Sequence, residues 1–311
     1  MQSVPTIARA RSLWWVAVCA TLFGCGSEEV TAPTTNNDLF ASVTLAAAAG
    51  SLSDLSSSVP DATGQFIYVV AKEPNGPGVF KVPAAGGTPT EVAAGDPFSQ
   101  PADIVLSTNG STIIVADPAA ETGKGAIYQI TPPNTAATPL ASTNGTAPVA
   151  LDLRQESGAD IIYYCGTKDG EKAVFKITTA GLEVLHKGAP LNAPTGIVVA
   201  NDGAIYLADQ GVVHRLSGGT ITQIATGLRM GSPAGITLTP DQKTLVVSSK
   251  SSDGKAQVDI ITIANGSRTV FNKIIGANSA PGGLHGARNA NGFTGVYSWI
   301  DRAAGIYRLG P

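Results

Sequence analysis

Charged residues, aromatic residues and cysteines are all scarce in this sequence. Of its 311 residues, 14% are charged and 6% are aromatic, and the net charge is −3 with no basic block. This composition excludes a coiled coil and lacks the basic surface with which proteins bind nucleic acid. The three cysteines, Cys19, Cys25 and Cys165, are too few for a disulfide framework, so the fold must be stabilised by packing.

Catalytic signatures and membrane-spanning runs are missing as well. The chain contains no Gly-x-Ser-x-Gly elbow, no His-Glu-x-x-His pair and no phosphate-binding loop. The apolar run over residues 13–23 is shorter than the roughly 20 residues that span a bilayer. Glycine and proline are plentiful instead, at 36 and 20 residues, and 43% of the chain is hydrophobic. These proportions indicate a globular protein rich in turns.

The first residues have the organisation of an export signal. Arg9 and Arg11 precede the apolar run, which ends in the sequence LFGC at residues 22–25. This ending resembles the bacterial lipobox, which implies a signal peptide over residues 1–24, acylation of Cys25 and a membrane anchor through that lipid. An ordinary export signal is the alternative. Residues 25–38 are a polar tether, and Gly26 after the cysteine implies sorting to the outer membrane.

Six similar units follow the tether. The second strand of each unit begins at residue 67, 113, 162, 205, 245 or 296, and these spacings of 40–51 residues are typical of propeller blades. The third strand repeats the order aliphatic, aromatic or His, long polar, aliphatic, at residues 79–82, 127–130, 174–177, 213–216 and 306–309. Because successive side chains alternate between the faces of a strand, both faces of each small sheet can pack against neighbouring sheets.

The two ends of the repeat are complementary. The last unit stops at Pro311, directly after its third strand, whereas residues 39–46 have a strand pattern and precede the first unit. Pairing these residues with the last unit would close a ring and protect its open edges. The sequence therefore predicts an all-β fold over residues 39–311: a six-bladed β-propeller of four-stranded antiparallel blades, closed by an N-terminal strand.

Short motifs before the second strands carry a family resemblance. The sequences PTGIVVANDGAIYLAD, from residue 194, and SPAGITLTPD, from residue 232, resemble the repeats of NHL-type propellers and of their SMP-30/gluconolactonase-like relatives. The resemblance implies the architecture and little about activity. The lactonase-like relatives hold a divalent cation with a Glu, two Asn and an Asp, and that set cannot be placed here: the first inner strand offers Asp54, and Thr195 stands where an Asn is wanted.

Several polar residues are candidates for a ligand site. Asp209 recurs as Asp117 and as Asp301, and this recurrence favours a structural role in which each carboxylate caps the turn that follows it. Propellers commonly bind ligands on the face that carries the loops before the inner strands. We therefore expect the ligand-contacting residues on those loops and strands, namely Gln100, Asp103, Asp152, Asn192, Ser232 and His285.

Two functions fit these residues. The first is a monomeric, extracytoplasmic binding module, anchored through Cys25, for a polar small molecule or a protein partner; no cofactor is expected. The alternative is a divergent metal-dependent hydrolase or lyase that uses Asp103, Asp152, Asn192 and His285 with Ca²⁺ or another divalent cation. The alternative requires those four side chains to converge on a common point.

Overall fold

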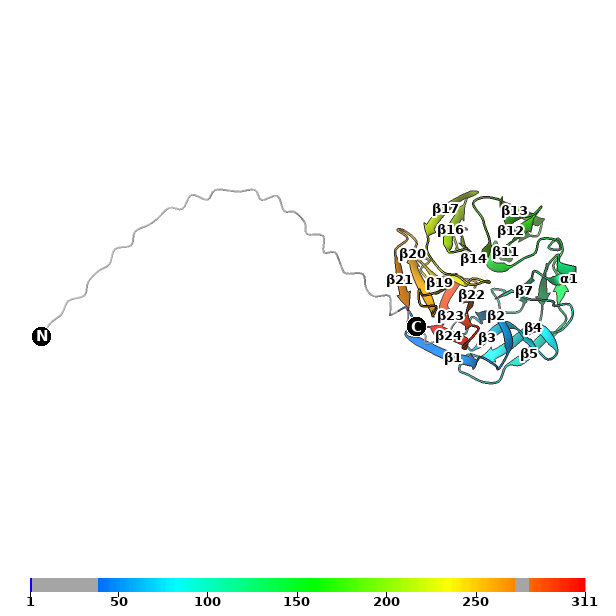
Figure 1. Ribbon diagram of the computed structural model, residues 1–311, viewed down its shortest axis with the longest axis horizontal. Helices are drawn as coiled ribbons and strands as arrows, with labels where there is room; N and C mark the ends of the chain where they lie inside the picture. The colour runs from blue at the N-terminus through cyan, green and yellow to red at the C-terminus, as the bar shows by residue number, and fades with distance from the viewer. Residues whose placement is uncertain (2–38, 272–279, 311) are drawn as a thin grey trace. The chain divides into compact units, whose positions relative to one another are not determined.

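The described residues form six small sheets arranged in a ring (Figure 1). The computed structural model describes residue 1, residues 39–271 and residues 280–310. Each sheet has four antiparallel strands, so the described chain is a six-bladed β-propeller, as the repeat predicts. The predicted signal peptide, Cys25 and the predicted tether lie outside the described residues. Within the described ranges, no helix has the length and apolar character to cross a bilayer.

The blades follow one another along the chain, and the strands of each blade run from the inside to the outside of the ring. Blade 1 comprises β2 (Ser53–Pro60), β3 (Phe66–Glu73), β4 (Gly76–Pro83) and β5 (Thr90–Ala94). Blade 2 comprises β6 (Asp103–Leu106), β7 (Ile113–Asp117), β8 (Ala126–Ile130) and β9 (Thr138–Pro139), with a helical turn, α1 (Ala120–Gly123), between β7 and β8. Blade 3 comprises β10 (Ala150–Glu156), β11 (Ala159–Lys168), β12 (Glu171–Thr178) and β13 (Gly181–Lys187).

The remaining three blades have the same plan, except that the outer strand of blade 6 comes from the N-terminal end of the propeller. Blade 4 comprises β14 (Pro194–Val199), β15 (Ile205–Asp209), β16 (Val212–Ser217) and β17 (Thr220–Ala225). Blade 5 comprises β18 (Ile236–Leu238), β19 (Thr244–Lys250), β20 (Ala256–Thr262) and β21 (Arg268–Phe271). Blade 6 comprises β22 (Pro281–Asn289), β23 (Gly292–Asp301) and β24 (Gly305–Gly310), and its outer strand is β1 (Ser42–Ala48).

Strand β1 closes the ring. It pairs antiparallel with β24, from Ser42 opposite Gly310 to Ala48 opposite Gly305, so the first and last strands lie side by side (Figure 1). This confirms the predicted closure; the strand begins three residues later and ends two residues later than the predicted range 39–46. Phe40, just before β1, is 1% exposed and packs edge-on against Phe271 and Tyr297. The closing segment therefore also contributes to the core.

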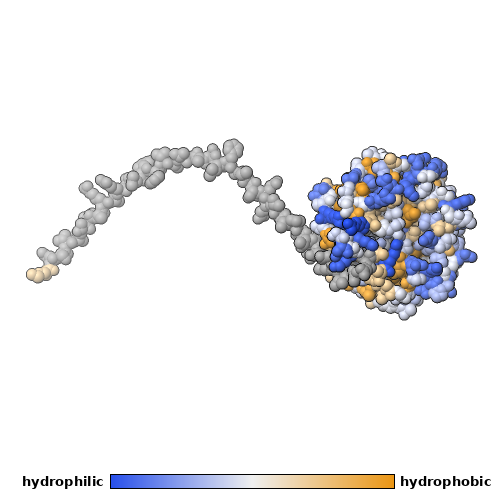
Figure 2. All heavy atoms as spheres, in the orientation of Figure 1, coloured by the Kyte–Doolittle hydropathy of each residue, from blue (hydrophilic) through white to orange (hydrophobic). Residues whose placement is uncertain are grey.

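The hydrophobic core lies between the blades. The described residues contain six buried apolar clusters, and each lies between two adjacent blades of the ring; the cluster between blades 4 and 5 also includes Phe293 of blade 6. The aromatic position of the third-strand repeat supplies Phe80, Tyr128 and Phe175 to these clusters, and His214 is buried at the equivalent position of blade 4. Both faces of a blade are covered, which explains why its inner and middle strands are apolar on both faces. On the face of the propeller seen in Figure 2, by contrast, hydrophilic and hydrophobic residues are interspersed.

Close approach of the inner strands explains the glycine of the repeated motif. A Cβ atom on Gly196 would lie 2.3 Å from the carbonyl oxygen of Ala234, and a Cβ atom on Gly235 would lie 2.3 Å from the backbone nitrogen of Leu284. A Cβ atom on Gly283 would lie 2.5 Å from that of Ser57, in the next blade. Glycine at these positions allows neighbouring inner strands to pack around the axis without a side chain between them.

Candidate functional site

One face of the ring carries the loops that precede the inner strands, together with the turns between second and third strands. We call this the pocket face, because a pocket of about 670 Å³ opens on it. This volume lies within the range of roughly 300–1,000 Å³ that small-molecule sites occupy. Its lining comes mainly from blades 1 and 2 and includes Asp54, Leu55, Ser56, Lys72, Pro77, Ser99, Gln100, Pro101, Ala102, Pro118 and Ala119, with Ser232, Pro233 and Arg302 from blades 5 and 6.

A bulge in the first inner strand shapes the wall of this pocket. The register of β2 against β3 passes directly from Ser53 opposite Lys72 to Ser57 opposite Val70, so residues 54–56 loop out of the ladder. Asp54 has φ = 47°, a left-handed conformation that non-glycine residues adopt infrequently. The hydroxyl of Ser56 donates a hydrogen bond of 2.8 Å to the carbonyl of Ala102 in blade 2. Bulges of this kind are common beside binding sites, where they redirect side chains.

Charged side chains of both signs line the pocket. Asp54 and Lys72 come from blade 1, and Arg302 comes from the turn between β23 and β24. The hydroxyl of Ser53 holds the backbone of Lys72 through a 2.8 Å hydrogen bond to its carbonyl. Arg302 donates from its guanidinium to the carbonyl oxygen of Ser232 in blade 5. The pocket is therefore a polar site that draws its charges from two adjacent blades.

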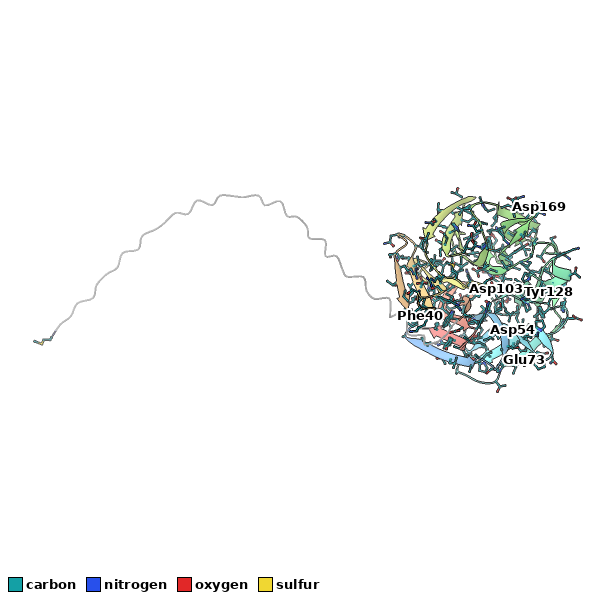
Figure 3. The ribbon with its side chains drawn as sticks, in the orientation of Figure 1. Phe40, Asp54, Glu73, Asp103, Tyr128 and Asp169 are labelled. Carbon is teal, nitrogen blue, oxygen red and sulfur yellow. The ribbon has the colours of Figure 1, made fainter. Side chains whose placement is uncertain are left out.

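The central channel contains a buried pair, His285 and Asp103. Figure 3 shows Asp103 near the centre of the ring, whereas Asp169 lies at the rim. Nε2 of His285 on β22 lies 2.8 Å from Oδ1 of Asp103 on β6, and the imidazole donates because a carboxylate only accepts. Oδ2 of Asp103 accepts a 2.8 Å hydrogen bond from the backbone N–H of Leu151 on β10. One carboxylate thus ties together blades 2, 3 and 6.

Asp152 and Arg288 form a second pair of the same kind. The guanidinium of Arg288 donates 2.7 Å hydrogen bonds to Oδ2 of Asp152 and to the carbonyl of Val199. The same carboxylate oxygen accepts from the backbone N–H of Val199 at 2.7 Å, which links blade 3 to blade 4. Arg288 also stacks over the ring of Phe293, 3.8 Å from its centroid. Only small cavities adjoin these groups: one of about 10 Å³ is lined by Asp152, His285 and Arg288, and another of about 80 Å³ is lined by Arg288.

The charged state of His285 links this network to pH. Burial and the positive charge of Arg288 both disfavour the charged imidazolium. The negative charge of Asp103, with a smaller contribution from Asp152, favours it by more. The net effect raises the pKa of His285 above its ordinary value of 6.5. The pair therefore stabilises the fold fully below that value, and its contribution is lost as the pH rises through the pKa of the folded state.

Replacing His285 with Gln should make the free energy of unfolding less dependent on pH between neutral and mildly alkaline conditions. Gln keeps a hydrogen-bond donor for Asp103 but carries no charge at any pH. We expect the free energy of unfolding of the wild-type chain to fall more steeply than that of His285→Gln as the pH rises above about 6.5. Urea unfolding across this range measures both, and parallel pH profiles would contradict the assignment.

The candidate ligand-contacting residues predicted from the sequence lie in three different parts of the structure. Gln100 and Ser232 line the pocket, whereas Asp103, Asp152 and His285 lie buried in the channel. Asn192 is exposed on the loop before β14, and its Nδ2 donates to the carbonyl of Pro190 at 3.3 Å. His285 contacts Asp103, but Asp152 is paired with Arg288 instead. Among the residues with described positions, no three His, Cys, Asp or Glu side chains are grouped so that they could hold a metal ion.

The recurring aspartates accept backbone hydrogen bonds, as a structural role requires, and Asp301 caps the following turn as predicted, through the N–H group of Ala303. Asp117 caps the following turn as predicted, through the N–H groups of Ala119 and Ala120, but it also accepts from the N–H groups of Ser99 and Gln100. The backbone hydrogen bonds of Asp209 run backward along the chain, from the N–H groups of Asn192 and Ala193. Prediction of a forward cap was thus wrong for Asp209, because the loop before the inner strand lies beside the end of the second strand.

None of the three charged residues of the pocket was predicted as a ligand contact from the sequence: Asp54, Lys72 and Arg302. Lys72 and Arg302 occupy ordinary turn or strand-end positions, and no spacing distinguishes them from solvated charges. The bulge that turns residues 54–56 toward the pocket has no marker in the sequence, since the residue with positive φ is Asp rather than Gly. The sequence therefore predicts the correct face but only part of the lining.

Comparison with known proteins identifies the architecture. No family model matches the chain, and no curated protein matches it. A solved TolB-type structure from Agrobacterium tumefaciens is similar over 83% of this chain and 90% of its own, with a TM-score of 0.60 and 16% identity. The fold is shared, and at this identity nothing finer follows.

Two further solved structures carry different functions on the same fold. An auxiliary nutrient binding protein from Bacteroides ovatus has a TM-score of 0.60 and 13% identity, over 84% of this chain and 70% of its own. A gluconolactonase from Xanthomonas campestris has a TM-score of 0.59 and 14% identity, over 84% of this chain and 87% of its own. One neighbour is named as a binding protein and the other as an enzyme, so the fold alone does not assign a function.

Proposed function

We propose that this chain is a lipid-anchored, extracytoplasmic propeller that binds a polar small molecule or a protein partner at the pocket face without turning it over. The observation that carries the proposal is the pocket of about 670 Å³, which is lined by hydroxyl, amide and charged side chains. Its volume and mixed walls are those of a ligand site. The nutrient-binding neighbour offers a precedent for a binding role on this fold.

The channel pairs weigh against the alternative of a metal-dependent hydrolase or lyase. Both oxygens of Asp103 are occupied, one by His285 and the other by a backbone N–H. Oδ2 of Asp152 is held by Arg288 and a backbone N–H. A carboxylate that is neutralised by a cation and by backbone donors is a poor ligand for a metal and a poor general base. These groups favour a structural role that stabilises the ring.

The anchor and the compartment rest on the first residues of the sequence. The LFGC ending supports acylation of Cys25, and the polar segment over residues 25–38 supports a tether that holds the propeller at a membrane. The composition agrees with export, because the mature chain would retain Cys165 as its single thiol apart from Cys25, and Cys165 is buried. We infer an outer-membrane location from Gly26, as the lipobox resemblance implies.

Filling the pocket should abolish ligand binding. Ser99 is exposed and lines the pocket, so Ser99→Trp would place an indole in the cavity, whereas Thr220→Trp places the same side chain on the outer edge of blade 4. The full-length chain, purified in detergent, is screened for thermal stabilisation against sugars, peptides and organic acids. A ligand present at 100 times its Kd adds about 2.7 kcal/mol of stability.

We expect the ligand-dependent shift to disappear in Ser99→Trp and to persist in Thr220→Trp. Equal shifts in both variants would place binding elsewhere on the molecule. Metal analysis of the same preparation, together with a lactone and ester hydrolysis assay, tests the alternative. Stoichiometric divalent metal combined with turnover would overturn the proposal of a binding module.

A further inference from the structure

Three charged side chains of the pocket lack a partner of opposite charge among the described residues. Asp54, Lys72 and Arg302 line the same cavity, and none of them takes part in the ion pairs formed within residues 39–271 and 280–310. Some arginines of the propeller do face carboxylates: Arg268 lies 2.6 Å from Asp259, and Arg288 lies 2.7 Å from Asp152. Others, such as Arg229 and Arg308, take part in no ion pair among the described residues and bond to carbonyl oxygens instead. The pocket therefore concentrates charge that the fold itself leaves uncompensated.

Arg302 is the most informative of the three. Its backbone N–H bonds to the carbonyl of Ala280 at 3.0 Å, and its guanidinium donates to the carbonyl of Ser232, so both ends of the residue are fixed. Arg302 is exposed to solvent at the pocket, yet partial burial lowers the pKa of its guanidinium, and no acidic side chain contributes in the opposite direction. A cation of this kind is expected to bind an anion from solution, because the hydrogen bonds and the opposite charge of the anion replace the interactions with water that partial burial removes.

The sign and number of the charges in the pocket indicate what charge the ligand carries. Lys72 and Arg302 are cations, and Asp54 is an anion, so the three side chains together carry about one positive charge, on a chain whose net charge is −3. A single carboxylate balances this site, whereas a phosphate dianion would meet the repulsion of Asp54. The planar fork of an arginine also matches a carboxylate in bidentate geometry.

The rest of the lining indicates what else the ligand carries. Asp54 accepts hydrogen bonds only, so it favours an ammonium or hydroxyl group on the same molecule. Gln100 and Ser99 are exposed at the pocket and offer further donors and acceptors, while Pro77, Pro101 and Pro118 supply apolar walls. A short molecule with a carboxylate at one end and donors along its body fits such a cavity.

We propose that the pocket binds a small organic monocarboxylate that also carries hydroxyl or ammonium groups, with its carboxylate on Arg302 and Lys72 and its donors on Asp54. Hydroxy acids and amino acids share this chemistry. The inference rests on the proposed function, since it names the class of ligand for the same pocket, and it assigns roles to residues that the sequence did not mark.

The test compares acids with their neutral analogues on the full-length chain in detergent. The probes are L-lactate, D-gluconate, L-serine and L-glutamine as carboxylates, lactamide and D-gluconamide as uncharged counterparts, and inorganic phosphate as the competing anion. Calorimetric titration measures Kd for each. We expect at least one carboxylate to bind, and its amide to bind about 10- to 100-fold more weakly, as for the loss of a charged hydrogen-bond partner.

Arg302→Gln supplies the decisive variant and Arg229→Gln its matched control. Arg229 is exposed on the loop before β18, outside the pocket lining, and donates to the carbonyl of Ser252. The variant should weaken carboxylate binding about 10- to 100-fold, whereas the control should leave Kd unchanged. Asp54→Asn should weaken L-serine and L-glutamine more than L-lactate, because L-lactate has no ammonium group.

Each contrary result has a definite meaning. If no carboxylate binds wild type more tightly than Arg302→Gln, or if Arg229→Gln loses affinity equally, the proposal is wrong. Tighter binding of phosphate than of every carboxylate also overturns it. Binding of neutral sugars or peptides that is abolished by Ser99→Trp but unaffected by Arg302→Gln would reject the carboxylate while leaving the broader binding function in place.

Discussion

Deletion of residues 39–48 is expected to abolish the cooperative unfolding transition of the propeller. This segment provides all of β1, and its loss would expose the full length of β24 as an open edge. It would also remove Phe40, which packs at 1% exposure against Phe271 and Tyr297 between blades 5 and 6. Loss of a buried Phe side chain alone costs about 3–5 kcal/mol, comparable to the roughly 5–15 kcal/mol of a whole domain.

A deletion of equal length in the tether provides the control. Removal of residues 26–35 leaves the closing strand and Phe40 in place, so we expect an unfolding curve identical to that of wild type. A finer comparison uses single substitutions: Phe40→Ala should destabilise by about 3–5 kcal/mol. Leu45→Ala, in the same closing segment at 46% exposure, should change stability by less than about 0.5 kcal/mol. Circular dichroism during urea unfolding measures all four. A native transition in the 39–48 deletion would show that the ring does not need this strand.

The repeat made the architecture predictable because it is a local property of the sequence. Each blade has an apolar second strand, and most have a third strand with an aromatic residue or His at one fixed position. Both elements lie within a window of a few tens of residues. The motif glycine at 196 and at 235 has a physical cause that the sequence could suggest and the structure confirms, namely the approach of the next inner strand to within 2.3 Å of the position that a Cβ atom would occupy. Even the closing strand followed from counting strands at the two ends.

The pairing of charged residues in the central channel could not be predicted from the repeat. Asp103 and His285 are separated by 182 residues and meet only because blades 2 and 6 share the central axis. Asp152 and Arg288 are 136 residues apart, and Arg288 was not a candidate at all. A single sequence indicates which blade and strand each residue occupies but not its height along the axis, and that height decides which charges pair.

The pocket shows a second limit of the sequence. Its shape depends on the bulge at residues 54–56, where three residues of β2 lie opposite the single residue Ala71 of β3 and leave the regular ladder. Period-two patterning assumes an unbroken ladder, so it fails at a bulge. Arg302 and Lys72 acquire meaning only once the turn of blade 6 and the strand end of blade 1 are known to border one cavity. Part of the pocket lining thus lies where the regular strand pattern is locally broken.

Replacement of Cys25 with Ser is expected to abolish acylation and release the protein from membranes. Several acyl chains on one cysteine anchor a protein stably, whereas a propeller without them has only its polar tether to hold it. Labelling of cells with radioactive palmitate, followed by separation of membranes, measures both effects. In Cys25→Ser we expect no label in the protein and its recovery in the soluble fraction.

The other two cysteines provide matched controls, since each removes one thiol and leaves Cys25 intact. Cys19 lies in the segment that the signal peptidase would remove, and Cys165 is fully buried in β11, where burial raises its pKa and suppresses the thiolate. Cys19→Ser and Cys165→Ser should therefore remain labelled and membrane-bound. If Cys25→Ser keeps its label, or if wild type carries none, the lipobox interpretation fails and an ordinary export signal takes its place. The ligand pocket does not depend on that outcome, because every residue that lines it belongs to the propeller.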